Sequence, residues 1–328
     1  MAAEKADVLM MGPLSPMIVD GIAEAFTLHK LWEAPDRDRL IAELAPRLRA
    51  MAAGGGFHDL IDANAMSKFP KLEMVSSFGV GYDHIDAKWA GEHGIVITNT
   101  PDVLNEEVAD TALGLLLCTV RELPQAERYL RAGNWAAKGD YRLTASLRGR
   151  KAGIVGLGRI GKAIARRLEA FGVPVVYHGR KEQPGVAHRY FANLVDMARE
   201  VDIIIVITPG GPQTKNLINA KVLDALGPNG ILINVSRGSV VDQDALIAAL
   251  KARRIHAAGL DVYVGEPNVS PELIALDNVV LLPHVGSASV HTRNAMGQLV
   301  IDNLVKWAAG EKPLTPVPET PWPPKRRS

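Results

Sequence analysis

The sequence predicts an α/β protein built from two doubly wound domains, each with a parallel sheet. Short apolar runs of strand length alternate with amphipathic segments of helix length along most of the chain, as in parallel α/β domains. A glycine-rich G-x-G-x-x-G turn falls between one such run and the helical segment that follows it. The 328 residues are enough for two domains, each with its own core.

The first domain is predicted from apolar runs in the N-terminal third of the chain. Helical patterns such as "DRDRLIAELA" separate these runs, so the strands are expected to be parallel. The expected strands are residues 8–11, 27–32, 48–52, 72–77 and 95–98.

A second series of strands follows and predicts the second domain. It comprises residues 151–155, 173–178, 202–207, 231–234, 257–260 and 279–282. Between the two series, "PDVLNEEVADTALGLLLCTVREL" predicts one long buried helix with Asp102 as its N-cap.

The C-terminal part predicts a helix and an extended end. The segment "HTRNAMGQLVIDNLVKWAAGEKP" has helical spacing, is expected to stop at Gly310 and Pro313, and is expected to return to the first domain. The tail "PVPETPWPPKRRS" is too rich in proline to be part of a core, and its basic end is expected to be a solvated terminus, with a binding patch as the alternative.

Composition excludes several classes of protein. The chain has 37 Lys and Arg against 36 Asp and Glu, so no basic field suggests a nucleic-acid partner. Cys118 is the only cysteine, which excludes an internal disulfide, and it is expected to be a small buried apolar side chain. The N-terminus "MAAEKADVLMMG" carries charges where a signal peptide is apolar, and no apolar run has membrane-spanning length. We therefore expect a cytoplasmic protein without membrane association.

The glycine-rich turn predicts a nucleotide site. Gly156 permits the tight turn, Gly158 lets the backbone approach a pyrophosphate, and Gly161 allows the helix to pack on the strand. The strand, the turn, the helix and the next strand together have the length of a dinucleotide-binding unit. The alternative is a glycine turn with a purely structural purpose.

The end of this unit indicates which nucleotide is bound. An Asp or Glu usually stands there and binds the ribose 2′-OH, but this chain has "HGRK" at 178–181. Arg180 and Lys181 favour a 2′-phosphate, so NADP(H) is predicted over NAD(H), with NADH still possible. The alternative is a solvated basic loop.

Three side chains with catalytic chemistry follow successive predicted strands. Arg237 follows the strand at 231–234, Glu266 follows the next strand, and His284 follows the last one. Each alone has an ordinary structural explanation. Together they match the needs of hydride transfer to a 2-keto acid: a cation for the carboxylate and carbonyl, a proton donor, and a carboxylate that keeps the donor charged. No set of metal ligands is predicted.

Five motifs resemble one known family over nearly the whole chain: "SSFGVGYDHID", "VGLGRIGKAIARRL", "NVSRGSVVDQDAL", "GLDVYVGEP" and "LLPHVGSASVHTRNAM". They are similar to the D-isomer-specific 2-hydroxyacid dehydrogenases, and within them to the NADPH-dependent glyoxylate/hydroxypyruvate reductases. This resemblance implies a homodimer. It also implies a Rossmann nucleotide-binding domain at about 98–284, inserted into a flavodoxin-like substrate domain formed by 1–97 and 285–328.

The resemblance also implies roles for particular residues. Arg237 would bind the substrate, His284 would donate the proton and Glu266 would be its partner. The backbone N–H groups of Val80 and Gly81 would bind the substrate carboxylate.

The "AAGGGF" loop, where many relatives have bulkier residues, would place Gly55 beside the substrate, and Asp261 would bind the nicotinamide amide. The residues expected to contact the cofactor are Gly156, Leu157, Gly158, Arg159, Ile160, Gly161, Arg180, Lys181, Ile207, Thr208, Pro209, Val235, Ser236, Asp261, His284 and Gly286.

The predicted reaction is NADPH-dependent reduction of glyoxylate to glycolate or of hydroxypyruvate to D-glycerate. One alternative is another substrate on the same scaffold, such as formate or phosphite; formate dehydrogenases have a Gln beside the His, so Glu266 argues against formate. The other alternative is a non-enzymatic nucleotide-sensing protein such as a co-repressor.

Overall fold

The computed structural model describes residues 5–54 and 60–324, and the chain divides into two compact units. Unit 1 consists of Met1–Leu104 and Ser289–Ser328, and unit 2 is Asn105–Ala288. The sequence placed the divisions at 97/98 and 284/285. The assignment of substrate to unit 1 and of nucleotide to unit 2 stays a prediction.

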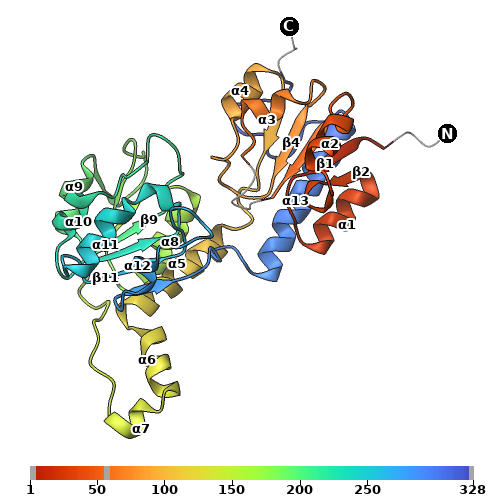
Figure 1. Cartoon of the computed structure of the whole chain (residues 1–328). Helices are drawn as coiled ribbons and strands as arrows, with labels where there is room; N and C mark the ends of the chain where they lie inside the picture. Colours follow the sequence, from red (N-terminus) through yellow and green to blue (C-terminus); the bar gives the residue numbers. More distant parts are fainter. Residues whose placement is uncertain (1–4, 55–59, 325–328) are drawn as a thin grey trace. The chain divides into compact units, whose positions relative to one another are not determined.

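Unit 1 contains a parallel sheet with the strand order β2-β1-β3-β4-β5 among its described residues (Figure 1). This is the flavodoxin-like order, which confirms the predicted fold. Its buried strands pack into one core, which includes Leu9, Met51, Val75 and Ile97. The strands are β1 (Asp7–Met10), β2 (Thr27–Lys30), β3 (Ala50–Ala53), β4 (Met74–Ser77) and β5 (Val96–Thr98).

The helices of unit 1 cover this sheet. The long α13 (Val290–Ala308) packs against α1 and β4, and the Ser76 hydroxyl donates to the Val300 carbonyl at 3.2 Å. Gly297 of α13 faces the side chain of Ile18 so closely that no larger residue fits there without a shift. The other helices are α1 (Pro16–Ala25), η1 (Leu31–Glu33), α2 (Arg37–Leu44), α3 (Ala63–Ser67) and α4 (Ala87–Glu92).

Unit 2 contains a second parallel sheet, with the order β12-β11-β10-β9-β6-β7-β8 among its described residues. Numbered from β6, this is the Rossmann order 3-2-1-4-5-6 with one more strand, so this fold prediction is also confirmed. The short edge strand β8 was not predicted. The strands are β6 (Ala152–Val155), β7 (Val175–His178), β8 (Arg189–Phe191), β9 (Ile203–Val206), β10 (Ile231–Asn234), β11 (Ala257–Leu260) and β12 (Val279–Leu281).

The helices of unit 2 flank this sheet. α5 (Asn105–Val120) packs against α8 (Arg159–Ala170) and against β10, β11 and β12. Within unit 2, α6 (Leu123–Arg131) and α7 (Asn134–Lys138) project away from the sheet (Figure 1). The others are α9 (Leu194–Glu200), α10 (Ala220–Leu226), η2 (Gly238–Val240), α11 (Gln243–Lys251) and α12 (Pro271–Ile274). Across the described part of the chain, no helix has the length and apolar character needed to cross a membrane.

The single helix predicted over residues 101–123 is wrong at both ends. Asp102 is not the N-cap, because it has a left-handed φ of 70° and the helix begins only at Asn105. At the other end, Glu122 has a left-handed φ of 51°, which interrupts the helix before α6 begins.

The prediction that the tail lies outside any core is wrong for residues 316–320, whereas its basic end, residues 325–328, lies outside the described residues. Pro316 forms an antiparallel bridge with Thr98, and the Val317 N–H donates to the Ile97 carbonyl at 2.9 Å. Val317 and Thr320 are each only 2% exposed. β5 is an edge strand, and an edge partner tolerates prolines because alternate N–H groups point away from the ladder.

Candidate active site

The three catalytic candidates of unit 2 follow the carboxyl ends of three strands of its sheet. Arg237 follows β10, Glu266 follows β11 and His284 follows β12, and these strands are neighbours in the sheet. Because neighbouring parallel strands have their carboxyl ends on the same side of the sheet, the fold brings these segments together, as the sequence predicted.

His284 and Glu266 form a directly hydrogen-bonded pair. Nδ1 of His284 lies 2.8 Å from Oε2 of Glu266. A carboxylate can only accept, so Nδ1 is the donor and Nε2 is the ring nitrogen that can give a proton to a ligand. The Glu266 side chain is 8% exposed and that of His284 is 31% exposed, so the acid is buried behind a histidine that solvent reaches.

Tyr263 holds this pair in place, a role that the sequence did not suggest. Its backbone N–H donates to Oε1 of Glu266 at 2.6 Å, so both carboxylate oxygens accept hydrogen bonds. Its hydroxyl lies 3.0 Å from the Leu260 carbonyl and 2.8 Å from the Leu282 carbonyl, which ties the ends of β11 and β12 together. Burial raises the pKa of Tyr263, so the hydroxyl stays a donor.

Asp261 holds the segment that follows His284. Its two carboxylate oxygens accept from the N–H groups of Val285 at 2.7 Å and Gly286 at 2.8 Å. Burial raises the pKa of Asp261, and these two N–H groups act against that rise. The structure thus gives Asp261 a positioning role; its contact with a nicotinamide amide stays a prediction.

Arg237 is held at its backbone and along its side chain. The Asn234 side chain donates to the Arg237 carbonyl at 3.0 Å, and Nη1 of Arg237 donates to the Ser236 carbonyl at 2.8 Å. Gly238 lies against the backbone of Tyr263, where an added Cβ would clash. These contacts fix the half-buried Arg237, and they place the adjacent Gly238 against the segment that carries Glu266.

The glycine-rich turn has the geometry that a pyrophosphate needs. Gly156 has a φ of 101° and lies against the Ile207 carbonyl, and a Cβ at Gly161 would clash with the Gly156 carbonyl. Gly158 differs, because a Cβ there would meet nothing within 4 Å. The turn is therefore closely packed at Gly156 and Gly161 and open beside Gly158. This open side lies at the start of α8, where the first N–H groups of the helix have no intrahelical acceptor.

The basic loop after β7 is ordered by β8 and by the glycine-rich turn. Nδ1 of His178 lies 2.9 Å from the Phe191 carbonyl, and the Tyr190 hydroxyl donates to the Gly179 carbonyl at 3.1 Å. The Gln183 amide donates to the Leu157 carbonyl at 2.7 Å, which links the loop to the turn.

Arg180 and Lys181 are the cations that this loop presents. Both are exposed, and within the described part of the chain neither has an acidic partner. Their charges are therefore available to an anion.

The remaining cofactor candidates lie at the same edge of the sheet. Residues 207–209 follow β9 and residues 235–236 follow β10. The Ile207 N–H donates to the Val155 carbonyl, and the Val235 N–H donates to the Val206 carbonyl. β6 and β9 flank the point where the strand order reverses, which is where ligands of such sheets bind.

The substrate-binding candidates of unit 1 follow β4. Within the described residues, the backbone N–H groups of Val80 and Gly81 donate to no acceptor. The preceding Gly79 has a φ of 151°, which requires glycine. Two neighbouring unpaired donors can bind a carboxylate. Gly55 lies outside the described residues.

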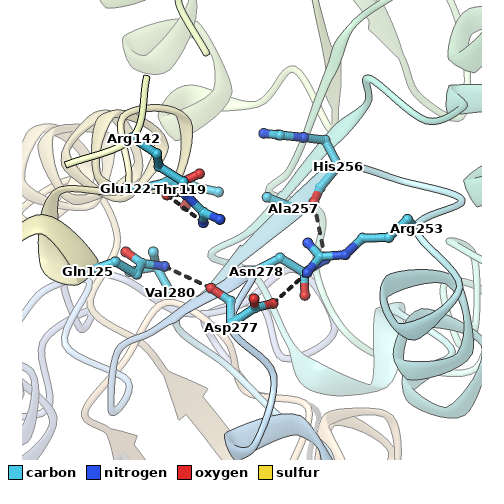
Figure 2. A pocket seen from close by; sticks show the side chains of 10 residues that line it. All are labelled: Thr119, Glu122, Gln125, Arg142, Arg253, His256, Ala257, Asp277, Asn278 and Val280. Atoms are coloured by element: carbon cyan, nitrogen blue, oxygen red, sulfur yellow. Dashed lines mark hydrogen bonds and ion pairs between the residues drawn. The ribbon is translucent and has the colours of Figure 1, made fainter. Parts of the chain in front are cut away.

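A small hollow of unit 2 contains none of the predicted site residues (Figure 2). It lies beside the start of β11 and the end of α5, and its charged side chains pair with one another: Arg142 with Glu122 at 2.7 Å, and Arg253 with Asp277 at 2.7 Å. Burial, then the charge of Arg150, lowers the pKa of His256 there. We assign no ligand to this hollow.

Comparison with known proteins gives a consistent result. Residues 113–286 match the family model of the D-isomer specific 2-hydroxyacid dehydrogenase, NAD binding domain. The crystal structure of an NADPH-dependent glyoxylate/hydroxypyruvate reductase from Sinorhizobium meliloti, in complex with NADP and malonate, is 49% identical, with a TM-score of 0.92 over 99% of this chain and 100% of that one.

Two curated relatives are similar over almost their whole length. Glyoxylate/hydroxypyruvate reductase A of Arabidopsis thaliana is 46% identical over 314 residues, covering 96% of this chain and 99% of the relative. Hydroxyphenylpyruvate reductase of Plectranthus scutellarioides is 43% identical with the same coverage.

A Rossmann sheet with an open glycine-rich turn, and a histidine–glutamate pair at the same edge, define a nucleotide-dependent dehydrogenase. The family match and the relatives identify the group within that class. The chain belongs to the D-isomer-specific 2-hydroxyacid dehydrogenases. It is therefore an enzyme, which excludes the alternative of a non-enzymatic nucleotide-sensing protein.

Proposed function

We propose that this enzyme is an NADPH-dependent reductase of small 2-keto acids, converting glyoxylate to glycolate and hydroxypyruvate to D-glycerate. The observation that carries the proposal is the His284–Glu266 pair at the sheet edge that also bears the glycine-rich turn. The similarity to glyoxylate/hydroxypyruvate reductases over nearly the whole chain supports the substrate class.

The preference for NADPH is supported by the basic loop. Arg180 and Lys181 have no acidic partner in the described part of the chain, and no carboxylate stands where the ribose 2′-OH would be bound. The Sinorhizobium relative is NADPH-dependent and was crystallised with NADP. NADH should bind more weakly because it lacks the phosphate.

The reaction adds a hydride to the carbonyl carbon and a proton to the carbonyl oxygen, so that a 2-keto acid becomes a 2-hydroxy acid. When bound, the nicotinamide supplies the hydride. Arg237 binds and polarises the substrate oxygens, and His284 gives the proton from Nε2 as charge develops on the carbonyl oxygen. Glu266 orients the ring through Nδ1 and stabilises its charged form. The N–H groups of Val80 and Gly81 bind the substrate carboxylate.

Steady-state kinetics with a panel of keto acids tests this function. Glyoxylate and hydroxypyruvate should be reduced with NADPH at kcat/KM values at least about tenfold above those for pyruvate and hydroxyphenylpyruvate. Higher kcat/KM with hydroxyphenylpyruvate would assign the enzyme to bulkier substrates. No turnover of any keto acid with either cofactor would contradict the proposal.

Gly158→Ala tests whether the open side of the glycine-rich turn receives the cofactor. A methyl group there meets nothing in the protein, so the melting temperature should not change. It would occupy the space where the pyrophosphate approaches, so the Kd for NADPH should rise by about tenfold, measured by fluorescence titration.

Gly114→Ala is the matched control, because a Cβ at this exposed helical position also meets nothing within 4 Å. It should leave the NADPH Kd unchanged and raise stability by about 0.5–1 kcal/mol. An unchanged Kd in a folded Gly158→Ala enzyme would exclude the pyrophosphate from this position.

We further propose that the enzyme is a cytoplasmic homodimer. The segment of unit 2 that contains α6 and α7 exposes large apolar side chains, among them Leu130 (56%), Trp135 (59%) and Leu143 (99%). Clustered exposed apolar groups favour an interface, here with a second copy. Sedimentation should show a dimer that Trp135→Glu weakens, and a monomeric wild type would contradict this.

A further inference from the structure

The C-terminal segment, residues 315–320, is connected to the carboxylate loop, residues 78–82, within unit 1. The carboxylate loop contains the two N–H groups that we propose for the substrate. Its base is fixed by a reciprocal pair: the Gly79 N–H donates to the Thr100 hydroxyl at 3.0 Å, and the Thr100 N–H donates to the Gly79 carbonyl at 2.8 Å. Two further connections fix the rest of the loop from the C-terminal segment.

The first connection runs from Thr315 through Asn99 to Val80. Thr315 is anchored by the buried Asn303 of α13, whose amide oxygen accepts from the Thr315 N–H at 3.1 Å. The Thr315 hydroxyl donates to the Asn99 carbonyl at 2.6 Å, and the Asn99 side chain donates to the Val80 carbonyl at 2.9 Å. The carbonyl of Val80 is thus held, which fixes the peptide plane that contains the Gly81 N–H.

The second connection joins Glu319 to Tyr82. The Tyr82 hydroxyl donates to Oε2 of Glu319 at 3.0 Å. The neighbouring Thr320 accepts from the Ile97 N–H at 2.9 Å, and Gly91 packs directly against the Glu319 carbonyl. Burial and the Glu319 carboxylate raise the pKa of Tyr82 to about 12, so the hydroxyl is a donor throughout the working pH range.

We propose that Thr315 and Glu319 are positioning residues: through Asn99 and Tyr82 they hold the carboxylate loop so that the Val80 and Gly81 N–H groups converge on the substrate carboxylate. The inference rests on the proposed function, which assigns the carboxylate to these donors. Donors that are already oriented bind an anion without an ordering cost at the moment of binding. Loosening the loop should therefore weaken substrate binding and leave the chemical step and the cofactor site unchanged.

Removing the second connection provides the test. Glu319→Ala and Tyr82→Phe should each raise the KM for glyoxylate about three- to tenfold, the effect of one hydrogen bond to a charged group at a partly exposed position. The kcat and the NADPH Kd should not change. The double variant should be no worse than either single variant, because both remove the same bond. Glu319→Gln keeps an acceptor oxygen and should restore most of the wild-type KM.

Glu311→Ala is the matched control. Glu311 is an exposed acid of the same C-terminal region with its own partner, Lys306, at 2.8 Å, and it has no connection to the carboxylate loop. It should leave the KM unchanged. Amide hydrogen exchange of the 78–82 peptide should be faster in Glu319→Ala than in Glu311→Ala, a readout that does not depend on turnover.

The outcomes separate this inference from the proposed function. An active wild type whose KM is unaffected by Glu319→Ala, or a kcat loss as large as the KM rise, overturns the positioning role alone. Unchanged exchange in the 78–82 peptide also overturns it. A wild type that reduces no keto acid removes the proposed function and this inference with it.

Discussion

Replacing His284 with alanine is expected to lower the kcat for glyoxylate reduction by about 10²- to 10⁴-fold, the range by which a positioned proton donor accelerates such steps. Nε2 is the ring nitrogen that can reach a ligand, because Nδ1 donates to Glu266. The NADPH Kd should stay within about twofold of wild type, since the loss concerns transition-state stabilisation and not cofactor binding. Steady-state kinetics and fluorescence titration measure the two quantities.

His29→Ala is the control for the loss of an acid-paired histidine. Nε2 of His29 lies 2.6 Å from Oδ1 of Asp7. His29 is on β2, which β1 and β3 separate in the sheet from β4 and from the Val80 and Gly81 that follow β4. Its kcat should match that of wild type. A His284→Ala enzyme that retains kcat within about tenfold would remove the histidine from proton transfer.

Glu266→Gln should reveal the electrostatic part of this pair. The carboxylate accepts from Nδ1 of His284 at 2.8 Å, so its replacement by a neutral amide removes the charge-assisted part of this hydrogen bond. The kcat for glyoxylate reduction should then fall, but by less than in His284→Ala, because an amide oxygen can still accept from Nδ1. An unchanged kcat would leave Glu266 with only an orienting role.

Buried parallel strands were predictable because each is a short, continuous run of apolar residues. β10 begins and ends where the sequence placed it, since a short apolar run enclosed on both faces has few alternatives. The glycine-rich turn and the order of Arg237, Glu266 and His284 follow from such strands. The contribution of Tyr263 was not predictable, because it uses a backbone N–H and a hydroxyl whose partners are visible only in the folded chain.

Elements at the edges of the sheets were missed because their sequences show little of the apolar pattern that marks a buried strand. β8 has one buried residue, Phe191, and an exposed Arg189, yet its backbone and Tyr190 order the basic loop. The C-terminal segment was misjudged because its prolines suggest a stretch outside any core, whereas Val317 and Thr320 pack against β5. Such pairing depends on an edge strand that only the tertiary fold provides. Asp102 has a favourable residue type for an N-cap, but its backbone is left-handed.

The 2′-phosphate should be recognised chiefly by Arg180, and its loss should separate the two cofactors. A hydrogen bond to a charged group contributes about 1.5 to 3 kcal/mol, so Arg180→Ala should raise the NADPH Kd roughly tenfold to a hundredfold. The NADH Kd should change less than about twofold, because NADH has no phosphate at that position. Fluorescence titration with both cofactors gives the two constants.

Arg189→Ala is the matched control for this change, because Arg189 is an exposed arginine of the adjacent β8 but pairs with Glu200 at 2.9 Å. Its replacement should leave the ratio of the NADPH Kd to the NADH Kd unchanged. Arg180→Ala should raise that ratio, because only NADPH binding is weakened. Tyr190 and Gln183 order the loop from the protein side, so the loop should keep its backbone conformation without the Arg180 guanidinium. Equal losses for NADPH and NADH in Arg180→Ala would therefore mean that Arg180 supports the fold and does not bind the phosphate.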